Sequence, residues 1–136
     1  MRTHQVSVKE LVTFIHRGGD LTSEFKSNAR AKQGTECHAY LQDKYSSQDQ
    51  KEVFVKHTAE IDHHQLILQG RIDGVLLRDA KPVIEEIKST TDALELMDET
   101  TRPEHLAQAK LYAYMYILKE NLRSMTIHLT YIHVNT

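Results

Sequence analysis

Three charged residues on two neighbouring predicted strands could together hold a divalent cation beside a phosphate. Asp73 lies in Gly70-Arg71-Ile72-Asp73-Gly74, and Glu86 and Lys88 lie in Glu85-Glu86-Ile87-Lys88-Ser89. Side chains alternate between the faces of a strand, so Glu86 and Lys88 point the same way, and Asp73 joins them if the strands pair. Mg²⁺ is usually held by one or two carboxylates with water and phosphate oxygens. A nearby lysine can orient a water or offset transition-state charge.

Charged residues also occupy the solvent face of many hairpins, so this pattern alone favours a surface hairpin. Two helical stretches on either side of the strands change that interpretation. Gly34-Thr35-Glu36-Cys37-His38-Ala39-Tyr40-Leu41 precedes them, and Gln108-Ala109-Lys110-Leu111-Tyr112 follows them. The order His, Asp, Glu-x-Lys, Gln-x-x-x-Tyr resembles the PD-(D/E)XK nuclease superfamily, specifically its RecB-like branch. The resemblance runs from Gly34 to Tyr112, which is most of the chain.

A narrower resemblance adds the opening of the chain. Val6-Ser7-Val8-Lys9-Glu10-Leu11-Val12 and Arg17-Gly18-Gly19-Asp20-Leu21 are similar to the N-terminal nuclease module of bacterial iron–sulfur-type superfamily-two DNA repair helicases. This resemblance implies that residues 1–136 form a single nuclease-like domain. It also implies that the chain is the N-terminal part of a larger protein with a C-terminal helicase domain.

The activity that the resemblance implies is metal-dependent hydrolysis of DNA in repair or recombination, coupled to a helicase. The substrate would be a single strand or a strand end, and an exonuclease is expected rather than an endonuclease. The alternative is a non-catalytic module that binds a DNA strand for the helicase. Mg²⁺ or Mn²⁺ would be the cofactor, and a histidine ligand favours Mn²⁺ because imidazole prefers transition metals. The resemblance implies that Asp73, Glu86 and Lys88 are the catalytic residues. The implied metal ligands are His38, Asp73, Glu86 and the backbone carbonyl of Ile87. Gln108 and Tyr112 are expected to lie near Lys88 and the DNA.

Several of these residues also have ordinary structural interpretations. A histidine on the apolar stripe of a helix, as at His38, is more often packed than ligating, and only the resemblance reverses this. His63 and His64 are adjacent, so in a strand they would point apart, and a hairpin turn explains them better. Glu85 points away from Glu86 and is expected to be structural or solvent-facing. Tyr114 and Tyr116 are expected to pack in the core.

Composition limits the possible classes of protein. The 136 residues are 40% hydrophobic and 26% charged, which is ordinary for one globular domain with one modest core. Cys37 is the only cysteine, which excludes an internal disulfide and a four-cysteine iron–sulfur cluster within this chain. No apolar run reaches the roughly 18 residues of a membrane span, and no signal peptide begins the chain, so a cytoplasmic protein without membrane partners is expected. The net charge of −2 argues mildly against broad nucleic-acid binding.

Hydrophobic periodicity predicts an α/β fold, and the resemblance implies that its core is restriction-endonuclease-like. Two N-terminal helices are expected over 7–17, where Ser7 and Glu10 fit a capping box, and over 28–45. Period-two patterning then predicts a three-strand antiparallel meander over 51–59, 65–77 and 83–89. A loop or short helical turn over 90–102, a helix over 103–120 and a further strand over 125–134 complete the fold.

Overall fold

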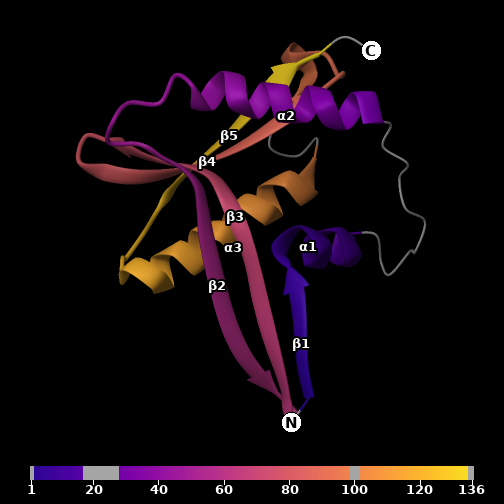
Figure 1. Cartoon of the computed structure of the whole chain (residues 1–136), viewed down its shortest axis with the longest axis vertical. Coiled ribbons are helices and arrows are strands. Elements are labelled where there is room, and N and C mark those ends of the chain that lie inside the picture. The colour runs from indigo at the N-terminus through magenta and orange to yellow at the C-terminus, as the bar shows by residue number, and fades with distance from the viewer. Residues whose placement is uncertain (1, 17–27, 99–101, 135–136) are drawn as a thin grey trace.

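One mixed β-sheet with helices on both faces organises the chain, shown here as a computed structural model that describes residues 2–16, 28–98 and 102–134 (Figure 1). The Arg17–Leu21 part of the N-terminal motif therefore lies outside the described residues. In chain order the elements are β1 (Arg2–Ser7), α1 (Val8–His16), α2 (Asn28–Gln42), β2 (Gln50–Ile61), β3 (His64–Arg78), β4 (Lys81–Thr90), the 3-10 helix η1 (Leu94–Leu96), α3 (Pro103–Glu120) and β5 (Thr126–His133).

The sheet forks along β3, its longest strand. β2 pairs with one edge of β3 over nearly its whole length. The other edge is divided between two strands: β1 runs parallel to residues 64–69, and β4 runs antiparallel to residues 74–78. β4 then continues beside β5, giving the strand order β1-β3-β4-β5. In Figure 1 the long β2–β3 ribbon and β1 run one way from the fork, and β4 and β5 run the other.

Both hairpins of the meander close through two residues in the left-handed region. These are Asp62 and His63, with φ of 47° and 65°, and Asp79 and Ala80, with φ of 51° and 63°. Two central residues with positive φ are typical of a type I′ turn, whose twist matches the flanking strands. The prediction of a turn at His63 is confirmed, with His64 as the first residue of β3.

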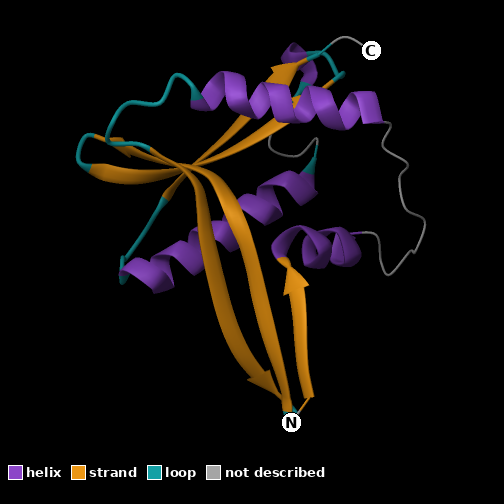
Figure 2. Cartoon of the chain, viewed as in Figure 1, coloured by secondary structure: helices purple, strands orange, loops and turns teal. Residues whose placement is uncertain are grey.

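The helices cover opposite faces of the sheet (Figure 2). α1 and α3 pack together on one face, and α2 lies against β4 on the other. β4, α3 and β5 form a parallel crossover unit, in which Pro103 occupies the first turn of α3 as expected. The core lies between the sheet and α3, and its buried residues include Val55, Ile72, Ile84, Tyr112 and Met115.

The α/β fold, the antiparallel meander and the final strand are confirmed, and the structure is compatible with a restriction-endonuclease-like core. The capping of α1 is also present, since Ser7 Oγ accepts a hydrogen bond from the Glu10 N–H at 3.0 Å. Two details differ from the expectations. β1 was not predicted, because its six residues are mostly polar and exposed. α2 ends at Gln42 rather than at residue 45. Within the described residues no helix is long and apolar enough to cross a membrane.

The prediction that Tyr114 packs in the core was wrong. Its side chain is 52% exposed, whereas Tyr116 is buried as expected. The buried residues of α3 near this point are Tyr112, Ala113, Met115 and Tyr116. This spacing follows one face of a helix, and residue 114 falls on the opposite face.

Candidate active site

Asp73 and Glu86 lie side by side at the fork of the sheet. Gly74 is the first residue of β3 that pairs with β4, and its partner is Glu85. The adjacent positions, Asp73 before Gly74 and Glu86 after Glu85, therefore lie beside each other. Past this point β4 no longer pairs with β3, and the Ile87 N–H instead donates to Asp73 Oδ2 at 2.7 Å. Both carboxylates are buried, with 7% of Asp73 and 3% of Glu86 exposed.

Burial and mutual repulsion disfavour the charged forms of these two carboxylates. Burial raises the pKa of Asp73, although the Ile87 N–H and the charges of His38 and Lys88 oppose the shift. Burial and then the charge of Asp73 raise the pKa of Glu86 to about 8, against the opposing effect of Lys88. Glu86 Oε2 is buried and has no hydrogen-bond partner within the described residues. At neutral pH this pair therefore favours either a shared proton or a bound cation.

Lys88 is held over this pair by α3. Its Nζ lies 3.4 Å from Glu86 Oε1 and donates a hydrogen bond to Gln108 Oε1 at 2.8 Å. The structure thus brings Gln108 to the lysine, as the sequence motif implied. Among the described residues, Gln108 and Glu86 are the two acceptors for its three N–H donors, so the ammonium is only partly satisfied there.

Tyr112 lies one turn after Gln108 and is buried against β3. Burial and the Glu86 charge raise the pKa of its hydroxyl to about 12. Gly70 makes this position possible, because a Cβ there would lie 2.6 Å from Tyr112 Oη. Tyr112 therefore contributes to the site chiefly by packing between α3 and β3 beneath the two carboxylates.

His38 approaches the site from α2. Its Nε2 lies 2.7 Å from the backbone oxygen of Ile87 and 3.8 Å from Asp73 Oδ2. Its side chain is 35% exposed, so it forms the open side of the site. The histidine, the Ile87 carbonyl and Asp73 thus come together as the resemblance implied.

Sequence reasoning missed Gln42, which lies one helical turn after His38. Its Nε2 donates to the backbone oxygen of Asp73 at 2.9 Å and to Glu52 Oε1 at 3.0 Å. Glu52 has φ of 54°, and the β2–β3 pairing skips Glu52 and Asp73. Gln42 therefore contacts the Asp73 carbonyl where the ladder is interrupted. The four-residue spacing from His38 is the signal that could have identified it.

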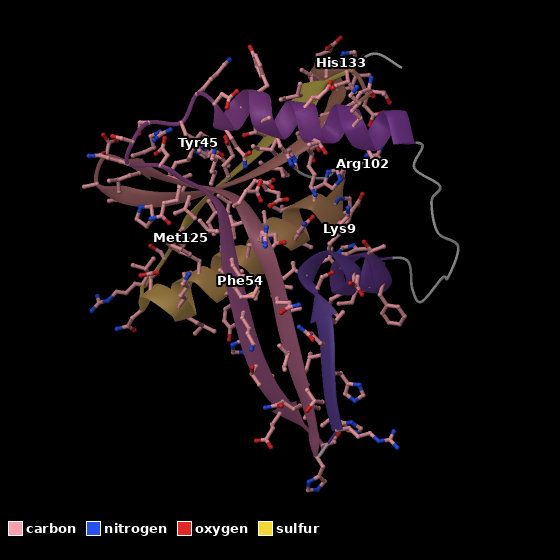
Figure 3. All side chains as sticks on the ribbon, viewed as in Figure 1. Lys9, Tyr45, Phe54, Arg102, Met125 and His133 are labelled. Atoms are coloured by element: carbon pink, nitrogen blue, oxygen red, sulfur yellow. The ribbon has the colours of Figure 1, made fainter. Side chains whose placement is uncertain are left out.

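Glu85 serves a different purpose on the other face of the sheet. It accepts hydrogen bonds from Tyr45 Oη at 2.7 Å and from Thr130 Oγ1 at 2.9 Å. Tyr45 lies between the end of α2 and the sheet (Figure 3), over Gly74, where a Cβ would clash with the ring. The expectation that Glu85 points away from Glu86 is confirmed, and its role is structural.

Side chains alone do not complete a metal site. Among the described residues no three His, Cys, Asp or Glu side chains are grouped closely enough to hold a metal ion. A cation at the fork would have to use the Ile87 carbonyl as well. Cys37, the only cysteine of the chain, is buried and free, as expected of a small apolar group.

Comparison with known proteins supports the fold. No family model and no curated protein matches the chain. Six chains of solved structures do match. One is described as the crystal structure of SSO0001, which is 17% identical to this chain with a TM-score of 0.64. The match covers 95% of this chain and 62% of the SSO0001 chain, so the present chain spans less than two thirds of that protein's length. At this identity the likeness shows a shared α/β fold.

Proposed function

We propose that this protein is a metal-dependent DNA nuclease of the PD-(D/E)XK type. One observation carries the proposal. Asp73 and Glu86 are two buried carboxylates held side by side, and Glu86 Oε2 has no hydrogen-bond partner within the described residues. Leaving a buried charged oxygen unpaired costs folding free energy. A divalent cation would remove that cost, and without a cation the two carboxyl groups must share a proton.

The atoms at the fork suit a hard divalent cation. Two ligands of one Mg²⁺ at right angles lie about 3 Å apart, given metal–oxygen distances near 2.0–2.1 Å. His38 Nε2 donates a hydrogen bond to the Ile87 oxygen at 2.7 Å and lies 3.8 Å from Asp73 Oδ2. The two distances bracket that spacing, and a bound ion would replace the hydrogen bond. We assign His38, Asp73, Glu86 and the Ile87 carbonyl as the ligands of Mg²⁺ or Mn²⁺. Such an ion supplies a water of lowered pKa and positive charge for phosphate oxygens.

The other residues position the substrate and the water. The Lys88 ammonium, steadied by Gln108, has a donor left for the attacking water or for a phosphate oxygen. Gln42 fixes the Asp73 backbone and Tyr112 packs beneath the two carboxylates, so the carboxylates keep their places when a strand binds. A single strand or a strand end, presented by an attached helicase in the cytoplasm, is the substrate we propose.

A chain that binds DNA without cleaving it is the second candidate. It is favoured by the finding that no three metal-ligating side chains are grouped within the described residues. The two candidates differ in what Lys88 does. A nuclease needs the ammonium for chemistry, whereas a binding module needs it for affinity alone.

The test is cleavage of single-stranded and duplex DNA with Mn²⁺ or Mg²⁺, with chelator as the control. Lys88→Ala is expected to abolish cleavage while calorimetry still detects Mn²⁺ binding, because the ammonium is not a ligand. Asp73→Ala is expected to abolish both. Lys51→Ala, an exposed lysine on β2, is the matched control and is expected to cleave normally. No cleavage by the wild-type chain, or undiminished cleavage by Lys88→Ala, would contradict the proposal.

A further inference from the structure

A tyrosine–histidine pair lies next to Lys88 on the same face of the sheet. Tyr131 of β5 is the partner of Lys88 of β4 in the parallel pairing, so the two residues lie about 4.8 Å apart between strands and point the same way. His105 Nδ1 lies 2.8 Å from Tyr131 Oη, and the two rings are 5.6 Å apart between centroids. The proposed catalytic roles use neither residue.

The helix α3 places the Gln108–Lys88 pair and the His105–Tyr131 pair in one row. His105 precedes Gln108 by three residues, so the two lie on neighbouring turns of one face, about 5–6 Å apart between Cβ atoms. Gln108 holds Lys88, and His105 holds Tyr131. Glu86, Lys88 and the Tyr131–His105 pair therefore lie in one row on this face of the sheet.

A largely apolar cavity, with the acidic residue Asp98 on its wall, opens beside this row. It has a volume of about 310 Å³ and is lined by Met97, Asp98, Leu106, Ile127, Leu129 and Tyr131. Ile127 and Leu129 lie opposite Ile84 and Glu86 in the β4–β5 pairing, so the cavity is on the face that carries the candidate site. Figure 3 places Arg102 at the start of α3, where it pairs with Asp92 at 2.9 Å.

We propose that the Tyr131–His105 pair and this cavity form a subsite for the nucleotide next to the scissile phosphate. The inference rests on the proposed nuclease function and specifies how a strand lies in that site. Tyr131 Oη donates to an oxygen of the neighbouring phosphate, and the apolar walls receive the attached base. A hydroxyl beside an apolar, partly aromatic wall matches the two surfaces of a nucleotide, a charged phosphate and a flat base.

His105 sets the direction of the Tyr131 hydroxyl. When Nδ1 carries a proton, it donates to Tyr131 Oη, and the phenolic proton is left for a phosphate oxygen. The ring of Tyr131 stays against the cavity in either case, because it is fixed by β5. His105 is therefore a positioning residue, and Tyr131 is the residue that touches the strand.

The experiment uses single-stranded oligonucleotides that each carry one neutral methylphosphonate, cleaved in Mn²⁺. For the wild-type chain, neutralising the phosphate next to the cleaved bond is expected to lower kcat/KM about tenfold, the usual effect of one charge-assisted hydrogen bond. For Tyr131→Phe the same neutralisation is expected to have almost no effect, because the hydroxyl that reads the charge is gone. His105→Gln is expected to reduce the effect in the same direction, which covers the case in which Tyr131→Phe is unstable.

Two further arms identify what occupies the subsite. Abasic nucleotides test the cavity: removing the base is expected to slow the wild-type chain and Tyr131→Phe, but not Leu106→Trp, whose larger side chain fills the cavity. Oligonucleotides whose ends carry either a phosphate or a hydroxyl test whether the subsite binds an internal phosphate or a terminal one. Tyr114→Phe, on the exposed side of α3, is the control and should keep the wild-type pattern.

The outcomes separate the two proposals. Wild-type and Tyr131→Phe chains that cleave DNA with equal sensitivity to the neutral phosphate overturn the subsite and leave the nuclease intact. A wild-type chain that cleaves no DNA overturns the nuclease proposal and the subsite with it.

Discussion

Replacing Glu86 by glutamine should make the metal-free protein more stable at neutral and alkaline pH. The amide has nearly the shape of the carboxylate but no charge, and its N–H can donate to Asp73. In the wild-type chain, burial and the Asp73 charge raise the pKa of Glu86 from 4.5 to about 8. The folded state therefore binds this proton more tightly than the unfolded state does.

The sign of the pH dependence follows from that difference. A carboxyl whose folded pKa is raised contributes stability that is complete below about pH 4.5 and is lost as the pH rises through about 8. A tenfold change in proton affinity corresponds to 1.36 kcal/mol. The free energy of unfolding of the wild-type chain is therefore expected to be about 3 kcal/mol lower at pH 7 than at pH 4.5. The raised pKa of Asp73 acts in the same direction.

The assay is urea unfolding in chelator at several values between pH 4.5 and 8. Wild-type stability is expected to fall with pH, and Glu86→Gln stability is expected to stay nearly flat. The two should agree near pH 4.5 and differ at pH 7 by about 3 kcal/mol, or roughly 10 °C in melting temperature. Glu60→Gln, an exposed carboxylate on β2, is the control and should follow wild type. Parallel curves for Glu86→Gln and wild type would refute the burial argument.

Three other predictions test the site. Saturating Mn²⁺ should raise the melting temperature of the wild-type chain in differential scanning calorimetry, since an ion at a hundredfold excess over its Kd stabilises the folded state by about 2.7 kcal/mol. Asp73→Asn should lose most of this shift. Gln108→Ala should reduce kcat for DNA cleavage about tenfold with little change in Mn²⁺ affinity, because it steadies Lys88 rather than the ion; equal losses in both would place Gln108 elsewhere in the mechanism. Gly70→Ala should cost about 1–3 kcal/mol in urea unfolding by pushing Tyr112 out of its place, and an unchanged stability would show that the tyrosine can move freely.

Local patterns predicted most of the elements. The period-two strands of the meander and the proline-initiated helix α3 carry their signals within a few residues, so their types and approximate bounds were found. β1 was missed because it is held by parallel pairing with β3, sixty residues away, and its polar sequence Arg2–Ser7 resembles a loop. Contacts at such a distance leave no periodic trace in a single sequence.

The candidate site was predictable only where local patterns place its residues. Alternation along β4 fixed the common direction of Glu86 and Lys88, and helical spacing fixed Gln108 with Tyr112. The register between β3 and β4, which brings Asp73 to Glu86, depends on the two-residue turn at Asp79 and Ala80, where neither residue is the glycine that usually marks such a turn. Gln42 escaped because its partner Asp73 lies on a strand distant in the sequence, and Tyr131 escaped because Lys88 and His105 come from β4 and α3.

Glu85 and Glu86 give an internal comparison that bears on function. Both are buried glutamates, adjacent on one strand, and both would have to be satisfied in a purely structural protein. Both oxygens of Glu85 accept hydrogen bonds, one from Tyr45 and one from Thr130.

Glu86 instead faces a second carboxylate, and its Oε2 has no partner within the described residues. The fold can thus satisfy a buried glutamate one residue away, on the face that α2 covers. Glu86 lies at the fork of the sheet, where its Oε1 pairs with Lys88, and carboxylates with strongly raised pKa values cluster at functional sites. The contrast between two neighbouring glutamates therefore supports a cation at the fork more strongly than the presence of acidic residues alone.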